Sequence, residues 1–219
     1  MLAACAGLQE PDPALSQTPL LETSLARRAT FAGADRSPGP QVFELEKKKD
    51  WKALTEYARE QLKGAPDSAD WELIAGYGLL QQRNYAQAVP AFSRATRRNP
   101  EDVDAWNLLG ESFRLAGDPQ AAVRTLEHAA TVSRTSGVTY YLLGEAYRDL
   151  GRPDRAVRAY GESVRIDGSF APTWFGLGLA YLQTGRREDF AEALERLRAL
   201  SPDLAKQLEK ARDGQQGSR

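Results

Sequence analysis

The stretch WNLLGESFRLAGDPQAAVRTLEHAA, residues 106–130, sets the period of the chain. Its first glycine belongs to a series with a step of 34 residues, formed by Gly76, Gly110, Gly144 and Gly178. A second series with the same step contains Ala88, Ala122, Ala156 and Phe190. A fixed period of a few tens of residues is the signature of repeat architectures. We therefore expect similar units stacked along the chain.

Within each unit the spacing of apolar residues predicts two helices. Trp106, Leu109, Gly110 and Phe113 follow the i, i+3, i+4, i+7 pattern that places them on one helix face, which we expect to be buried. Gly117 then marks a turn, and the Pro that follows two residues later suits the first turn of a helix, where its missing N–H would be unpaired anyway. Each unit is thus predicted to be a helical hairpin, and the fold to be all-α.

These residues resemble the tetratricopeptide repeat (TPR). That pattern has an aromatic, a Leu-Gly pair and a Tyr on the first helix, then Ala, an aromatic and a final Pro. The resemblance implies a right-handed α-solenoid of stacked antiparallel helix pairs. The first unit departs from the pattern, because Trp71 lies one place early and Glu72 occupies the aromatic position. Without insertion or deletion, the units are residues 69–102, 103–136, 137–170 and 171–204.

Shorter segments flank the four units. Residues 41–68 are interpreted as a degenerate N-terminal unit, since Trp51 lies 34 residues before Tyr85 and Pro66 lies 34 before Pro100. Residues 203–212 are predicted to form a capping helix, because the end of a stack must present a polar outer face. Residues 213–219 are predicted to be a disordered tail.

Composition argues against several classes of function. Lys and Arg total 29 against 30 Asp and Glu, so the chain lacks the basic excess that attracts nucleic acid. With one Cys and one His, multi-cysteine metal sites and two-histidine proton relays are excluded. His128 is predicted to face outward from a second helix. No catalytic set can be assembled, so we expect no enzyme activity, no cofactor and no metal.

The N-terminal residues 1–40 are rich in Pro, Ser, Ala and Gly, which favours a flexible tether. Leu2-Ala3-Ala4-Cys5 resembles the bacterial lipobox, which implies lipid attachment at Cys5 and a periplasm-facing lipoprotein. The basic and apolar signal stretch that should precede it is not in the sequence. Either the true start lies upstream of Met1, or the match is accidental and the protein is cytoplasmic.

The resemblance also implies that a partner protein or peptide binds in a concave groove lined by first helices. Aromatic and Arg side chains are enriched at interaction hot spots, and here they recur along one helix face. The alternative is that Tyr141 and Phe175 pack against the neighbouring repeat. Binding of chaperone C-termini is not expected, because the chain has Glu where that clamp uses Asn or a base. The candidate groove residues are Tyr77, Asn107, Glu111, Arg114, Tyr141, Glu145, Arg148 and Phe175.

The function expected from these observations is a non-catalytic scaffold. By analogy with TPR lipoproteins that assist pilus secretins, it would help to assemble a membrane or secretion complex in the cell envelope. A cytoplasmic adaptor or regulatory subunit of an enzyme complex is the alternative. An enzyme with an unrecognised site is a third hypothesis.

Overall fold

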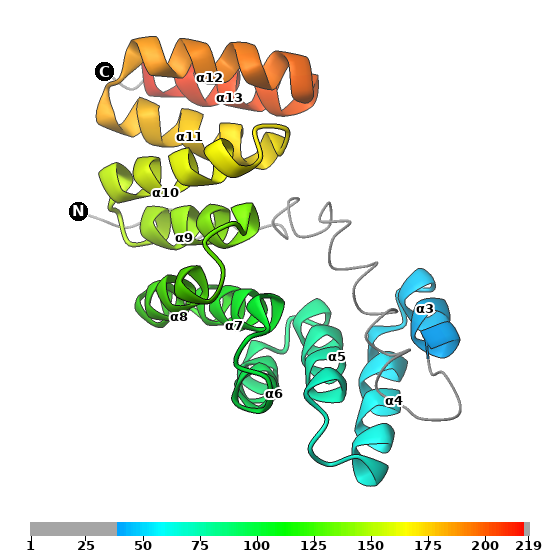
Figure 1. Ribbon diagram of the computed structural model, residues 1–219. Coiled ribbons are helices and arrows are strands. Elements are labelled where there is room, and N and C mark those ends of the chain that lie inside the picture. The colour runs from blue at the N-terminus through cyan, green and yellow to red at the C-terminus, as the bar shows by residue number, and fades with distance from the viewer. Residues whose placement is uncertain (1–38, 217–219) are drawn as a thin grey trace, which may run out of the picture. The chain divides into compact units, whose positions relative to one another are not determined.

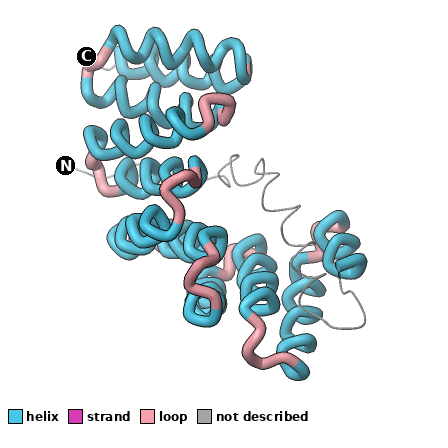
Figure 2. Tube along the Cα trace, in the orientation of Figure 1, coloured by secondary structure: helices cyan, strands magenta, loops and turns pink. Residues whose placement is uncertain are grey.

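The computed structural model describes residues 39–216, and this range contains helices and loops but no strand (Figure 2). The all-α prediction is confirmed for this part of the chain, in which no helix is long and apolar enough to cross a membrane. Cys5 and nearly all of the predicted tether lie outside it. The helices are α3 (Gly39–Lys47), α4 (Trp51–Gly64), α5 (Ala69–Gln81), α6 (Tyr85–Arg98), α7 (Val103–Leu115), α8 (Pro119–Val132), α9 (Gly137–Asp149), α10 (Pro153–Ile166), α11 (Ala171–Thr184), α12 (Arg187–Leu200) and α13 (Pro202–Gln216).

Two compact units divide the chain at residue 50, and the second, Trp51–Arg219, holds α4 to α13. In this second unit each helix packs against the next one along the chain, so that the helices form a continuous stack (Figure 1). The pairs α5/α6, α7/α8, α9/α10 and α11/α12 correspond to the four predicted repeats. First helices also contact one another, α5 with α7, α7 with α9, and α9 with α11. A central first helix therefore has neighbours on several sides.

A left-handed residue recurs every 34 positions, just after α3 and at the turn inside each of the four hairpins. In the later repeats it is a glycine, which adopts positive φ without a steric penalty. At the two earlier turns the residue has a side chain. In each turn its N–H donates to the carbonyl three residues before, and the next N–H donates to a carbonyl five residues before, as in a Schellman cap. The residues and their φ angles are Lys49 (54°), Arg83 (57°), Gly117 (86°), Gly151 (65°) and Gly185 (72°).

The regular spacing of glycines on first helices is explained by close packing of the second helix. A Cβ at Gly76 would lie 2.7 Å from a ring carbon of Phe92, and a Cβ at Gly110 would lie 2.6 Å from Leu126 Cγ. Gly76, Gly110 and Gly144 thus make room for the bulky residue 16 positions later. Packing of this density leaves no space for an added methyl group without movement.

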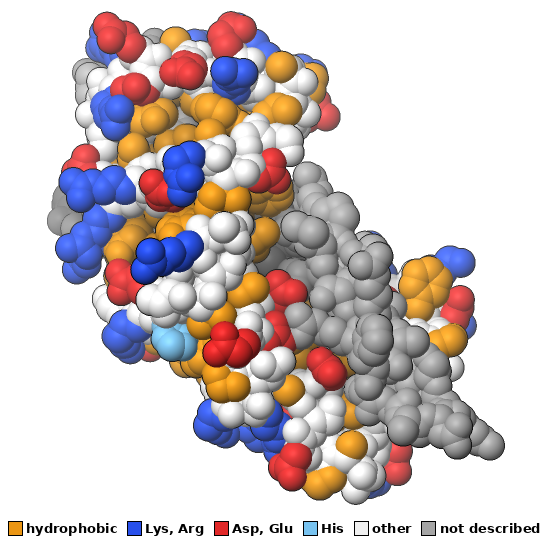
Figure 3. All heavy atoms as spheres, viewed as in Figure 1, with side chains coloured by type: hydrophobic (Ala, Val, Ile, Leu, Met, Phe, Trp, Pro, Cys, Tyr) orange, Lys and Arg blue, Asp and Glu red, His pale blue; other side chains and the backbone are white. Residues whose placement is uncertain are grey.

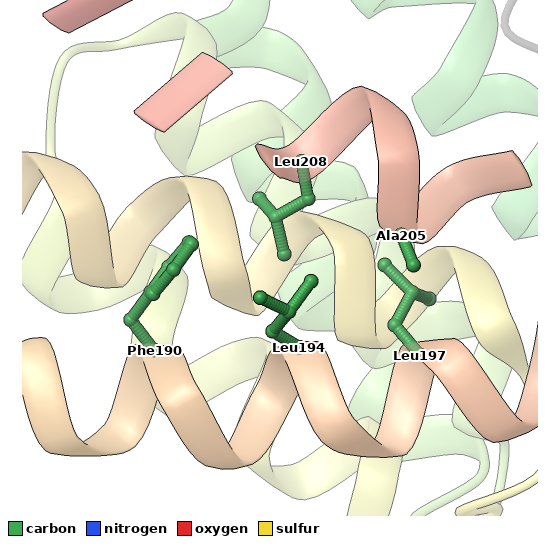
Figure 4. Packing of buried hydrophobic residues seen from close by; sticks show 5 residues of the cluster. All are labelled: Phe190, Leu194, Leu197, Ala205 and Leu208. Carbon is green, nitrogen blue, oxygen red and sulfur yellow. The ribbon is translucent and has the colours of Figure 1, made fainter. Parts of the chain in front are cut away.

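The last hairpin is covered by α13, which contacts both α11 and α12. Leu208 and Ala205 of α13 meet Phe190, Leu194 and Leu197 of α12 in a buried cluster (Figure 4). A Cβ at Gly178 would also meet Leu208, whereas the spacing in the earlier repeats predicts that it would meet Leu194 of α12.

The C-terminal helix is longer than predicted. It runs from Pro202 to Gln216, whereas the sequence predicts a disordered tail from residue 213. No proline follows Pro202, and the buried Ala205 and Leu208 hold the helix on the array, so the helix continues past Gly214.

Candidate functional site

The candidate groove residues lie on one side of the four first helices, which we call the first-helix face. The structure brings them together in chain order, from α5 through α7 and α9 to α11. Six are buried and two are half-buried. The buried ones are Tyr77, Asn107, Glu111, Arg114, Tyr141 and Glu145, and the half-buried ones are Arg148 and Phe175.

The sequence predicted a buried packing face and an accessible groove on each first helix, and the structure differs from this prediction. On α7, Asn107 and Glu111 are buried, whereas Trp106 and Phe113 of the predicted packed face are only half-buried. The reason is that α7 has first helices on both flanks, α5 and α9, in addition to its second-helix neighbours. What the first-helix face binds stays a prediction.

A bidentate ion pair joins the two charged candidates of α7. Arg114 donates from Nε and Nη2 to the two carboxylate oxygens of Glu111, each at 2.7 Å, and from Nη1 to Asp149 of α9 at 3.0 Å. Its side chain is 3% exposed. Burial by itself lowers the pKa of Arg114, but the carboxylates of Glu111, Glu145 and Asp149 outweigh it and raise the pKa. The guanidinium of Arg114 stays charged, and its hydrogen bonds go to carboxylates of the same chain.

The same pair recurs one repeat later with a different environment. Arg148 donates from Nη2 to Glu145, whose other carboxylate oxygen accepts the hydroxyl of Tyr160. The Nε of Arg148 is buried without a hydrogen-bond partner, yet 28% of the side chain is exposed. Burial lowers the pKa of Arg148, whereas Glu145 and Tyr160 raise it, and the net change is upward. This guanidinium is charged and has donors left over.

Tyr160 reaches the first-helix face from the second helix α10, which the sequence analysis did not anticipate. It fills the bulky core position of its repeat and is fully buried beside Gly144 and Gly176. Burial, and then Glu145, raise the pKa of its hydroxyl well above the usual value. The equivalent residues of the neighbouring repeats are Phe92, Leu126 and Leu194, so a lone hydroxyl among them was the signal that could have revealed this contact.

In the first repeat a buried carboxylate replaces the aromatic residue of the later ones. Glu72 accepts from Arg94 Nε at 2.7 Å and from Arg98 Nη1 at 2.9 Å, both on α6. At the equivalent position, the Trp106 indole donates to the carbonyl of Pro100 at 2.8 Å and so holds the preceding loop. The ion pairs compensate for the buried charge at Oε1 of Glu72, whereas its Oε2 is buried without a hydrogen-bond partner.

The C-terminal end of the first-helix face is apolar. Phe175, Leu179 and Leu182 of α11 are half-buried and pack partly against the cluster formed by α12 and α13. Figure 3 shows hydrophobic side chains gathered over this part of the array, between charged ones. Tyr141 is buried, and its ring centroid is 5.3 Å from that of Phe170, the last residue of its own repeat unit. Phe175 packs and is also partly accessible.

The described part of the chain offers little further chemistry. Residues 39–216 contain no group of three or more His, Cys, Asp or Glu side chains arranged to hold a metal ion. His128 is exposed, as predicted, with its ring centroid 4.3 Å from that of Trp106.

Comparison with known proteins gives the following matches. The family model described as Tetratricopeptide repeat matches residues 73–135 and 141–205. Superkiller protein 3 of Saccharomyces cerevisiae is 25% identical over an alignment of 88 residues, and the match covers 37% of this chain and 6% of that protein.

Similar folds occur among solved structures. MamA has a TM-score of 0.63 at 21% identity, with 79% of this chain and 96% of that chain covered. YrrB, described as a TPR protein with an unusual peptide-binding site, has a TM-score of 0.62 at 20% identity, with coverage of 77% and 88%. A thermophilic TPR protein of Thermus thermophilus, TTC0263, has a TM-score of 0.65 at 17% identity, with coverage of 87% and 98%.

Proposed function

The chain belongs to the tetratricopeptide-repeat family, and from this premise we propose that it is a non-catalytic scaffold that holds a segment of a partner protein on its first-helix face. The fold itself supports a role in protein–protein interaction. The observation that carries the proposal is the gradient along that face, from paired charges on α7 and α9 to accessible apolar side chains on α11. YrrB, which shares the fold, is described as having a peptide-binding site.

Accessibility supports some of the candidate residues better than others as direct contacts with a partner. Arg148 and Phe175 are half-buried and have surface to offer, and Leu179 and Leu182 extend that surface on α11. The six buried candidates have little surface to offer a partner, and we expect them to hold the accessible side chains in position by packing. A central contact that becomes desolvated on binding contributes most of the affinity at such interfaces.

Site-specific photo-crosslinking tests the location. A photoreactive amino acid at position 175 or 182 should give covalent adducts with the partner in cells that express the full chain. The photoreactive amino acid placed at position 124 or 158 should give no adducts. Arg124 and Arg158 are exposed on the second helices α8 and α10. Adducts at the second-helix positions alone would place the site elsewhere.

Substitution then tests the energetics. Phe175→Ala should weaken binding of the crosslinked partner by about 2 kcal/mol, the scale of a hot-spot residue. Tyr141→Ala is a poorer test, because Tyr141 is buried and its loss would leave a cavity. Thermal unfolding of both variants separates lost binding from lost structure. Full-strength binding by Phe175→Ala would contradict the proposal.

We further propose that the scaffold is anchored in the cell envelope through Cys5, where it would assist assembly of a membrane or secretion complex. The lipobox-like Leu2-Ala3-Ala4-Cys5 supports this proposal. Expressed with its upstream codons in a Gram-negative host, the protein should be lipidated and membrane-associated, and Cys5→Ser should abolish processing. An upstream region without a basic, apolar stretch would favour the cytoplasmic adaptor instead.

A further inference from the structure

Two arginines that occupy the same position of successive repeats are unequally satisfied. Arg114 and Arg148 lie 34 residues apart, and each pairs with a glutamate three residues earlier on its own helix. Arg114 takes both oxygens of Glu111 and a third acceptor, Asp149. Arg148 shares Glu145 with the hydroxyl of Tyr160 and leaves its Nε without a partner.

The sequence explains the difference. The second carboxylate of Arg114 comes from the last residue of the following first helix, Asp149 of α9. One repeat later the equivalent residue is Gln183 of α11, which is exposed and carries no charge. The first helix α11 contacts α9, as α9 contacts α7, so the repeat symmetry predicts that Gln183 faces Arg148 as Asp149 faces Arg114.

We propose that an acidic side chain of the partner segment binds Arg148 and takes the place that Asp149 takes on Arg114. This inference rests on the proposed function and specifies the partner's chemistry. The Nε of Arg148 is buried, so the donor left for an incoming group is Nη1, the atom through which Arg114 binds Asp149. An unused guanidinium donor favours a carboxylate, because charge-assisted bonds of Arg to carboxylate are among the strongest hydrogen bonds in proteins. The 28% exposed side chain of Arg148 is accessible to an incoming group, whereas that of Arg114 at 3% is not.

The apolar surface of α11, the first helix that contacts α9, defines the rest of the partner segment. Phe175, Leu179 and Leu182 of α11 are apolar and partly accessible. A segment that fits both features carries apolar side chains close to an Asp or Glu. The carboxylate is that of a side chain inside the segment, so a free C-terminus is not required.

The repeat symmetry supplies an internal competitor for the test. Gln183→Asp should provide Arg148 with the carboxylate that it lacks, and should weaken binding of an acidic segment by about tenfold or more, the effect of losing one charged hydrogen bond. Arg148→Gln should have a similar effect by removing the donor. Gln120→Asp, which adds the same charge at an exposed position of α8, should leave the affinity unchanged.

The probe is a displayed library of random peptides with amidated or fused C-termini, selected on the full chain. Peptides selected by the wild type should be enriched in Asp or Glu beside apolar residues, and this enrichment should disappear with Gln183→Asp and with Arg148→Gln. Selected peptides without acidic enrichment, or with enrichment that both variants retain, would overturn the inference and leave the scaffold function standing. Failure to select any peptide would overturn both.

A readout without a ligand completes the test. In the free protein, the Arg148 Nε–H resonance should exchange with water at least several-fold more slowly in Gln183→Asp than in the wild type, because the guanidinium becomes fixed by a second carboxylate. Unchanged exchange would show that position 183 does not reach Arg148, and the equivalence on which the inference depends would be wrong.

Discussion

The central repeats and the last repeat solve the same packing problem with different chemistry. In residues 103–170 the first-helix face carries two ion pairs, the buried Glu111–Arg114 and the partly buried Glu145–Arg148. In residues 171–204 the equivalent positions are the apolar Leu179 and Leu182 of α11. The backbone follows the same hairpin in both. The repeat therefore prescribes where a side chain lies, while its chemistry is free to vary.

The two solutions differ in what happens when one partner is removed. A buried charge left without its partner is costly, whereas an apolar side chain at a partly exposed position loses only some contact area. The central repeats should for this reason be more sensitive to single substitutions, and the last repeat more tolerant.

Removal of one buried carboxylate should have the largest effect. Glu111→Leu removes the two carboxylate oxygens that accept from Nε and Nη2 of the buried Arg114, and should lower the free energy of unfolding by about 3 kcal/mol or more. Leu179→Ala at the equivalent place in the last repeat should cost less. The double variant Glu111→Leu/Arg114→Leu should recover most of the loss. Chemical denaturation checks all three, and a double variant as unstable as the single one would contradict the account.

Glycine substitutions in the third repeat should come next. Gly144→Ala brings a Cβ against the buried ring of Tyr160, and should destabilise the array by about 1–3 kcal/mol through overpacking. Gly178→Ala in the last repeat should cost less, since it meets the end of the more flexible Leu208.

The control lies in the partner helix of the same hairpin. Gly161 is in α10, and a Cβ there has no neighbour within 4 Å. Gly161→Ala should stabilise the protein by about 0.5–1 kcal/mol through helix propensity. Thermal unfolding of the three variants would refute this packing if all three shifted in the same direction.

The turns offer a smaller contrast between the first repeat and the second. Arg83 adopts φ of 57°, which costs a residue with a side chain on the order of 1 kcal/mol. Arg83→Gly should relieve this strain and raise the unfolding midpoint slightly, because the greater freedom of Gly in the unfolded chain offsets part of the gain. Gly117→Arg, at the same place one repeat later, should lower the midpoint. Shifts of the same sign would count against a shared turn.

An exposed pair with the same sequence spacing should show the smallest effect. Arg165 and Glu162 of α10 are joined at 2.7 Å, but their side chains are 67% and 47% exposed. Glu162→Ala should change the free energy of unfolding by less than about 0.5 kcal/mol, and added salt should reduce even that. A loss comparable with that of Glu111→Leu would mean that burial is not what separates the two pairs.

The sequence by itself determined the repeat, the helix class and the turns of this protein. Glycine at 110 and a bulky residue at 126 recur every 34 positions, and a pattern of that length specifies a hairpin through local spacing alone. Arg83 is the exception among the hairpin turns, because no glycine marks its left-handed conformation and the surrounding hairpin imposes it.

Only the tertiary structure decided which side chains of the first-helix face are buried and paired within the chain. Residue spacing along one helix predicts which side chains share a face of that helix. Whether a face is buried depends on the neighbouring helices, and α7 and α9 have first-helix neighbours on both flanks. Contacts that cross between helices, such as Arg114 with Asp149 or Tyr160 with Glu145, are set by that assembly. Residue spacing within one helix cannot predict these contacts, because the partner atoms belong to another helix that packing brings close.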